Sequence, residues 1–225
     1  MKLLAIDCAA NLCAACVYDA AARQELGRSV LDLGKGHAEQ LMAVIAEALK
    51  TAATDYAGLD AIAVSVGPGS FTGLRVGVST ARGLALALKV PAIGVTTLEA
   101  LASEAAAAFL GRPVLAALDA GREEIHAAFY DELSVLTYGP AVTTLANAVT
   151  MATESASVLA GTAAAQIAAS AGRAFDIGPQ TATADIATYA RLAAAKGGSE
   201  RPKPLYLRGA DAKPQAGFIL SRQQN

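Results

Sequence analysis

Residues 61–88 constrain the fold more than any other stretch of the chain. The β-branched run Ala-Ile-Ala-Val-Ser-Val is followed by the glycine- and proline-rich turn 67–70 and then by an apolar segment with a period near 3.6 residues. This order predicts a strand, a tight loop and a helix over residues 71–88. The glycines allow the loop to approach a neighbour closely, and Ser70 or Thr72 is placed to cap the helix.

Two stripes run along the predicted helix. One recurs every four residues and has almost no side chains: Gly73, Gly77, Ala81 and Ala85. The other is an apolar ridge with polar flanks: Phe71, Leu74 and Val78, beside Arg75, Ser79 and Arg82. A glycine destabilises a helix interior by about 0.8–1 kcal/mol relative to alanine, so Gly73, Gly77 and Gly83 are expected to make compensating contacts. We expect one stripe to pack on the protein's own sheet and the other to meet a foreign helix.

The loop matches neither common phosphate-binding motif. A Walker loop ends in Gly-Lys-Ser/Thr, whereas Gly-Leu-Arg stands at this place. A dinucleotide loop requires an acidic residue about 20 positions after its glycines, and none occurs before Glu99. The residues therefore disfavour both kinds of site.

Composition limits the class of protein. A chain of 225 residues with 54% hydrophobic residues can form one large domain or two small ones without disulfides. No apolar run reaches the length of a transmembrane helix, and the N-terminus reads as a strand rather than a signal peptide, so we expect a cytoplasmic protein without membrane contact. A net charge of −2 disfavours autonomous nucleic-acid binding, so any such contact is expected to be shared with a partner.

The cysteines and histidines do not form a metal-binding pattern. Cys13 and Cys16 have Cys-x-x-Cys spacing, but they lie in a predicted strand, where residues three apart face opposite sides. Together with Cys8 they are interpreted as buried thiols rather than as a redox or zinc site. His37 and His126 are the only histidines, and His37 is interpreted as a helix cap or surface residue rather than a catalytic group.

An internal repeat divides the chain. Residues 4–19 align without gaps on residues 116–131, and in both copies a strand ends in Asp and a second strand closes on Tyr-Asp. The repeat predicts two domains of one topology, residues 1–110 and 111–225. The alternative is two ordinary hairpins with acidic turn residues.

The remaining patterns predict further elements. They are strands over residues 25–33 and 91–95, helices over 38–53 and 96–109, and weak helices over 144–153, 162–171 and 183–195. The tail from residue 200 has five Lys or Arg and two Asp or Glu, which indicates a solvated end or, alternatively, a nucleic-acid contact.

The sequence resembles the TsaB (YeaZ) family at residues 67–77, which read Gly-Pro-Gly-Ser-Phe-Thr-Gly-Leu-Arg-Val-Gly. The segments His-Ala-Glu-Gln-Leu at residues 37–41 and Pro-Leu-Tyr-Leu-Arg at residues 204–208 resemble two further family motifs. The resemblance implies an α/β fold of two tandem domains like those of actin, Hsp70 and sugar kinases, with the second domain shortened. In that architecture Asp7 and Asp119 would face each other across a nucleotide cleft.

The resemblance also implies a role in making threonylcarbamoyladenosine beside the tRNA anticodon. It implies a non-catalytic protein that binds and activates a TsaD-type subunit, acts with a TsaE-type ATPase and reaches tRNA through the complex. A homodimer is expected when the partner is absent, because both helices of the first domain carry more apolar surface than one sheet needs. ATP and metal are expected on the catalytic partner, because Thr97 and Leu101 stand where that subunit carries two metal-binding histidines. The turn Asp7-Cys8-Ala9 also lacks the hydroxyls of the family's Asp-Thr-Ser turn.

Two sets of site residues follow. The partner-binding set comprises Leu41, Ile45, Phe71, Leu74, Arg75, Val78 and Arg82. Asp7 and Asp119 form a nucleotide-binding pair, and no catalytic or metal-binding residue is assigned. The alternative function is a small phosphotransferase or glycoprotease-like enzyme of the same superfamily. In the phosphotransferase the two Asp residues would hold a magnesium-bound water. No Ser-His-Asp or zinc signature supports proteolysis.

Overall fold

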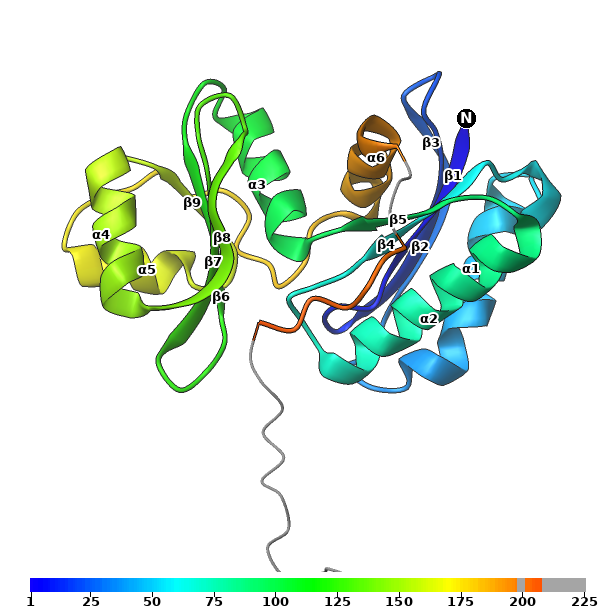
Figure 1. Cartoon of the computed structure of the whole chain (residues 1–225), viewed down its shortest axis with the longest axis horizontal. Helices are drawn as coiled ribbons and strands as arrows, with labels where there is room; N and C mark the ends of the chain where they lie inside the picture. The colour runs from blue at the N-terminus through cyan, green and yellow to red at the C-terminus, as the bar shows by residue number, and fades with distance from the viewer. Residues whose placement is uncertain (198–200, 208–225) are drawn as a thin grey trace, which may run out of the picture.

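The computed structural model describes residues 1–197 and 201–207. Two β-sheets stand beside each other, with helices on their outer faces and two helices between them (Figure 1). The elements run in the order β1 (Lys2–Asp7), β2 (Leu12–Asp19), β3 (Gln24–Asp32), α1 (His37–Thr51), η1 (Tyr56–Gly58), β4 (Ala61–Ser65), α2 (Phe71–Leu88), β5 (Ala92–Val95), α3 (Thr97–Ala108), β6 (Val114–Asp119), β7 (Glu124–Tyr130), β8 (Leu136–Thr144), α4 (Leu145–Ser155), β9 (Val158–Ala160), α5 (Ala164–Ala171) and α6 (Ile186–Lys196).

The two sheets have the same topology, and the second is one strand shorter. In the first sheet the strand order is β3-β2-β1-β4-β5. β2 is antiparallel to both of its neighbours, β1 and β3, whereas β4 and β5 are parallel to β1. The second sheet has the order β8-β7-β6-β9 with the same directions, and an isolated parallel bridge from Leu159 to Ile177 stands where a fifth strand would follow. This arrangement confirms the predicted α/β fold with a shortened second half.

Two helices cross from one half of the sequence to the sheet of the other half. α3, which follows the first sheet in the chain, contacts β6, β7 and β9, whereas α6, which follows the second sheet, contacts β1, β2, β4 and β5. Both lie between the sheets (Figure 1), and one continuous core joins them to residues of both sheets. The first lobe is therefore the first sheet with α1, α2 and α6, and the second lobe is the second sheet with α3, α4 and α5. The predicted division at residue 110 separates the two sheets. α3 and α6, however, each pack on the sheet that lies on the other side of this division.

The gapless repeat is out of register by one residue in the structure. Asp7 pairs with Ala14 across the first hairpin, but Asp119 pairs with Ile125 rather than with His126. Because side chains alternate between faces, a one-residue slip turns equivalent positions to opposite sides. Asp7 is buried, whereas Asp119 is exposed. The register therefore turns Asp7 and Asp119 to different faces of their sheets, so the two side chains do not form the predicted pair across a cleft.

Most predicted elements lie within three residues of their expected bounds, but the sequence did not predict β8 and β9. β8 is an exposed edge strand whose pattern is interrupted by Gly139 and Pro140, and β9 has only three residues. The interpretation of His37 is wrong, because its side chain is neither a cap nor a surface group. The ring is buried, and its Nε2 lies 3.3 Å from the carbonyl oxygen of Leu12.

The start of α2 packs directly on the turn that follows β1. A Cβ on Gly73 would lie 2.0 Å from the carbonyl oxygen of Cys8, so the predicted close approach is confirmed. Ser70 caps α2 by accepting a hydrogen bond from the backbone N–H of Gly73, also as predicted. Gly83 differs, because apart from the nearby backbone of its own helix and its chain neighbours no described atom lies within 4 Å of the place where its Cβ would be. Among the described residues, none makes the compensating contact expected for that glycine.

The three cysteines are buried and unbridged, as the sequence indicated. Cys8 and Cys13 belong to the core under α1 and α2, whereas Cys16 belongs to the core between the sheets. Cys13 and Cys16 therefore face opposite sides of β2, which separates the two thiols of the Cys-x-x-Cys spacing.

Candidate functional site

The predicted partner-binding residues divide into a buried and an exposed group. Leu41 and Ile45 on α1, and Leu74 and Val78 on α2, have at most 2% of their surface exposed. Their assignment to a docking surface is therefore wrong, since Leu74 and Val78 face inward together with the small-residue stripe of α2. The physical reason is that α1 and α2 alone cover the outer side of a five-stranded sheet, which requires a wide apolar stripe on each helix (Figure 1).

The outer sides of α1 and α2 carry the rest of the predicted set, Phe71, Arg75 and Arg82, which are exposed. They also expose two large apolar side chains that the sequence analysis did not select. Leu86 is 78% exposed and Met42 is 49% exposed. We call the exposed residues of these two helices around Met42, Arg82 and Leu86 the outer helical face. These exposed large apolar side chains make the outer side of the two helices a candidate association surface.

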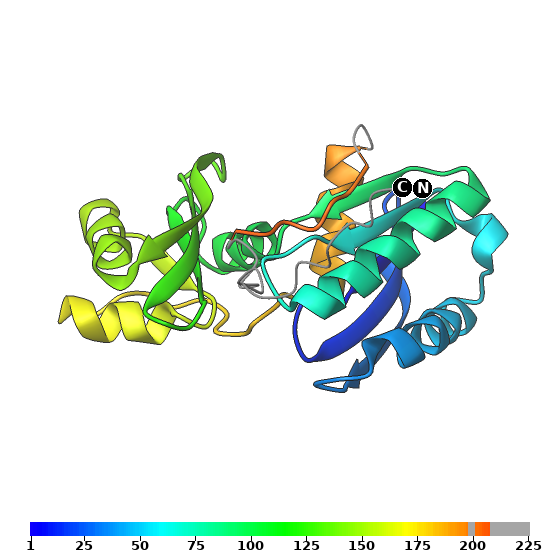
Figure 2. The same ribbon diagram turned by 60° about the horizontal axis from the view of Figure 1, so that its bottom comes forward.

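Residues 201–207, here called the strap, lie against the first lobe and run toward its junction with the second lobe (Figure 2). The backbone N–H of Leu205 donates to the carbonyl oxygen of Val66 at 2.7 Å. Near the other end, Pro202 packs against Gly94, where a Cβ would come within 3.3 Å of the proline ring. The strap is thus held at two places, beside the ends of β4 and β5.

The strap meets the start of α2 in a three-residue stack formed by Tyr206, Phe71 and Arg75. The two ring centres are 5.1 Å apart, and the guanidinium carbon lies 3.8 Å from the centre of the Phe71 ring. The Arg75 Nε–H also donates to the Tyr206 hydroxyl at 2.9 Å. The tyrosine of the C-terminal motif therefore packs on the helix that follows the signature loop.

Asp7 lies at the end of β1 inside a closed hydrogen-bond network. Its Oδ1 accepts hydrogen bonds from the Ser65 hydroxyl and from the backbone N–H of Ala9, and its Oδ2 accepts one from the Thr183 hydroxyl. Because Thr183 gives its only hydrogen to Asp7, the hydroxyl of Tyr189, 2.7 Å away, donates to Thr183. The network joins β1 and β4 to α6, so it fastens the C-terminal helix to the first sheet.

Burial controls the acidity of this network. Desolvation raises the pKa of the Asp7 carboxyl above its ordinary value, although the hydrogen bonds from Ser65, Thr183 and Ala9 act in the opposite direction. Desolvation likewise raises the pKa of Tyr189 well above its ordinary value, with the nearby Asp7 charge acting in the same sense. Burial therefore shifts the ionisation of both groups toward higher pH.

We expect the Asp7→Asn variant to lose a pH dependence of stability that the wild type has. Folding raises the pKa of the Asp7 carboxyl, so the folded state binds the proton more tightly than the unfolded state does. The free energy of unfolding therefore increases as the pH falls through the folded-state pKa, and it stops increasing once the pH is below the unfolded-state pKa of about 3.9. An amide still accepts from Ser65 and donates to Thr183, so the variant should fold. Urea unfolding at a series of pH values measures the difference between the two proteins.

The matched control for that experiment is Ser65→Ala. It removes a hydroxyl whose hydrogen bond lowers the pKa of Asp7, so the gain in stability on acidification should begin at a higher pH than in the wild type. Parallel pH profiles for the wild type and Asp7→Asn would show that Asp7 does not titrate differently in the folded state.

The other predicted positions do not assemble a site. The exposed carboxylate of Asp119 accepts the backbone N–H of Gly121 at 2.7 Å, and Thr97 and Leu101 are buried in α3. Within residues 1–197 and 201–207, no three His, Cys, Asp or Glu side chains lie together in a way that could hold a metal ion. No helix in this part of the chain is long and apolar enough to cross a membrane.

The hydrogen-bond partners of Asp7 were not predicted from the sequence. Ser65 closes a predicted strand, and its hydroxyl has no local feature that points to Asp7. Thr183 lies in the Thr- and Ala-rich segment before α6, 176 residues from Asp7 in the chain. Only the return of α6 to the first sheet brings these residues together, so no local signal in the sequence could have found them.

Comparisons with known proteins agree on one family. A family model described as TsaD, tRNA N6-adenosine threonylcarbamoyltransferase, matches residues 32–195. The Escherichia coli protein TsaB, named as a tRNA threonylcarbamoyladenosine biosynthesis protein, is 35% identical over 133 residues. The chain belongs to the TsaB (YeaZ) family. The match spans 58% of this chain and 55% of the E. coli TsaB protein, just over half of its length.

Other relatives match a larger part of the chain. An uncharacterized protein of Mycobacterium tuberculosis is 36% identical over 194 residues, which are 85% of this chain and 84% of that protein. Two solved Pseudomonas aeruginosa structures, YeaZ and a protein described as similar to peptidase YeaZ, have TM-scores of 0.69 and 0.75. Both are 24% identical and cover 92% of this chain and 99% of theirs, so they show the fold. An Arthrobacter glucomannokinase, at a TM-score of 0.51 over 86% of this chain and 98% of that chain, shares the sugar-kinase architecture.

Proposed function

We propose that this TsaB-family chain is a non-catalytic partner that binds and activates a TsaD-type subunit, which transfers a threonylcarbamoyl group to the tRNA adenosine next to the anticodon. The observation that carries the proposal is the closed state of Asp7. This carboxyl lies at the turn where the fold would present a group to a nucleotide, yet it is 1% exposed and its oxygens are occupied by Ser65, Ala9 and Thr183. A phosphotransferase would need this carboxylate open to a metal-bound water.

The outer helical face is the proposed contact with the TsaD-type subunit. Met42 and Leu86 supply apolar anchors, and Arg82 supplies a charged one. The same face would pair two copies of the chain when the partner is absent. In this proposal the TsaE-type ATPase joins through the complex, the catalytic subunit holds ATP and metal, and the assembly works in the cytoplasm.

The test combines activity with assembly. The purified chain alone should neither hydrolyse ATP nor modify tRNA, whereas mixing it with the TsaD-type and TsaE-type proteins and the threonylcarbamoyl donor should produce modified tRNA, detected by nucleoside mass spectrometry. Leaving this chain out should reduce the product to background. A metal-dependent turnover by the chain alone that survives further purification, or full activity of the other proteins without it, would refute the proposal.

A further inference from the structure

We propose that the Phe71–Arg75–Tyr206 stack and the strap beside it form an RNA-contacting surface, on which an unpaired base stacks while the neighbouring cations hold phosphates. The proposal rests on the proposed function in one respect, since the RNA would be the tRNA substrate of the complex. It adds that residues of this chain, rather than the catalytic subunit alone, hold that RNA.

Charge is strongly segregated at this place. The chain has a net charge of −2, yet residues 61–98 contain three cations and no Asp or Glu, and residues 201–207 add Arg201 and Lys203 without an acidic residue. Arg75, Arg201 and Lys203 are all exposed. In the described part of the chain none of these three forms an ion pair, whereas Arg28, Arg112 and Lys196 each do. The strap and the start of α2 are therefore a local positive surface.

Aromatic rings stand within this positive surface. Phe71 is 52% exposed and Tyr206 is 44% exposed, although a phenylalanine is usually buried. The guanidinium of Arg75 orders both side chains, because it stacks on the Phe71 ring and donates to the Tyr206 hydroxyl. Exposed rings beside cations that lack carboxylate partners match the way proteins bind single-stranded RNA, by base stacking and phosphate contact.

The backbone holds this surface in place before any ligand arrives. The hydrogen bond from Leu205 to Val66 and the packing of Pro202 on Gly94 fix the strap on both sides of Lys203. A fixed surface loses little conformational freedom on binding. Protein interfaces are also enriched in aromatic residues and arginine but are depleted in lysine, so the exposed Lys203 favours RNA over a protein partner.

The experiment measures the affinity of the assembled complex for a fluorescently labelled, unmodified tRNA transcript. The double variant Phe71→Ala/Tyr206→Ala should bind about tenfold or more weakly, because it removes the rings on which a base would stack. Arg201→Ala/Lys203→Ala should also weaken binding and reduce the slope of log affinity against log salt by about 0.7 for each phosphate that the variant no longer neutralises. Tyr206→Phe, which keeps the ring, should stay close to the wild type.

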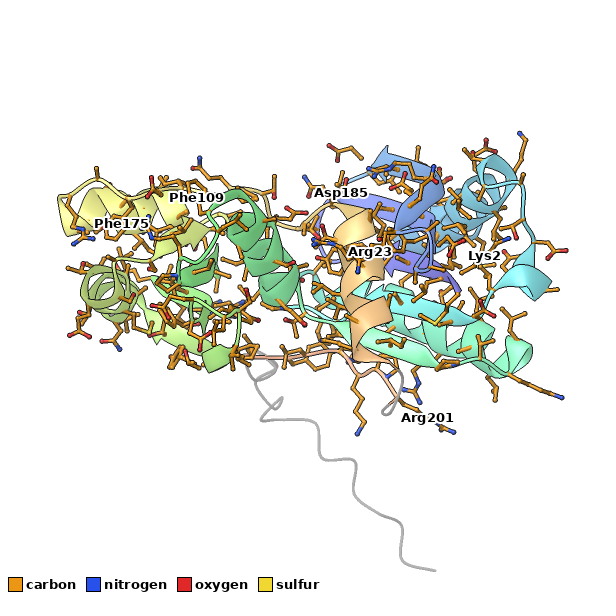
Figure 3. The ribbon with its side chains drawn as sticks, turned by 90° about the horizontal axis from the view of Figure 1, so that it is seen from above. Lys2, Arg23, Phe109, Phe175, Asp185 and Arg201 are labelled. Atoms are coloured by element: carbon orange, nitrogen blue, oxygen red, sulfur yellow. The ribbon has the colours of Figure 1, made fainter. Side chains whose placement is uncertain are left out.

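The matched control is Arg173→Ala in the second lobe. Its guanidinium lies on an aromatic ring, 4.5 Å from the centre of Phe175, so the variant removes an exposed cation beside a ring outside the proposed surface. Figure 3 shows Phe175 at the far end of the second lobe and Arg201 at the first lobe. Arg173→Ala should leave tRNA affinity unchanged. A pull-down with the TsaD-type subunit accompanies each affinity measurement.

The outcomes separate this inference from the proposed function. Weaker tRNA binding by variants that still assemble with the subunit supports it. Unchanged tRNA binding in assembled variants overturns it, and loss of assembly with unchanged RNA binding shows that the surface contacts protein instead. If the wild type does not bind the subunit, the proposed function fails, and the inference is decided on the isolated chain at low salt: tRNA binding that depends on Phe71 and Tyr206 supports it, and no such binding overturns it.

Discussion

The Val78→Glu variant is expected to lose the folded state. Val78 is 2% exposed in the apolar core between α2 and the first sheet. Burying an unpaired charge, or protonating it and still burying a polar group, costs several kcal/mol, which is a large part of a total stability of about 5–15 kcal/mol. We expect little soluble protein and no cooperative thermal transition by circular dichroism.

The control is Ser79→Glu, one position along the same helix. Ser79 is exposed, so the same carboxylate would remain in water and the melting temperature should change little. The expectation from sequence alone is that Val78→Glu folds and fails only to bind its partner, so the experiment distinguishes the two views. A folded Val78→Glu protein with wild-type stability would show that this side of α2 is open in solution.

The Leu86→Glu variant should fold normally and fail to bind the TsaD-type subunit. Leu86 is 78% exposed, so the substitution leaves the core unchanged, but it places a charge in the centre of the proposed apolar contact. Loss of a central anchor weakens protein interfaces by about 2 kcal/mol or more, roughly thirtyfold in affinity. Titration calorimetry with the subunit measures the loss, and light scattering should show that the variant also stays monomeric when alone.

Leu133→Glu serves as the matched control for Leu86→Glu. Leu133 is 83% exposed on the hairpin between β7 and β8, so it tests the same change on the other lobe. Its affinity for the subunit should equal that of the wild type. If Leu86→Glu binds as well as the control does, the partner occupies another surface and the outer helical face has a different use.

The sequence alone determined the local structure around α2. The bounds 71–88, the cap by Ser70 and the close approach at Gly73 follow from nearest neighbours along the chain, because propensity, capping and glycine spacing act over a few residues. The family resemblance rests on the same short segment. The hairpins of the repeat were also visible, because their alternation and acidic ends are local.

The tertiary structure decided which faces are buried and which groups meet. Leu74 and Val78 have the same apolar pattern whether a helix covers its own sheet or a partner, so only the packing of α2 shows that they are core. The register of β6 against β7, and the contact of Thr183 with Asp7, depend on pairing between distant segments. The sequence determined the elements because their causes are local, and the structure determined the site because its causes are contacts across up to 176 residues of chain.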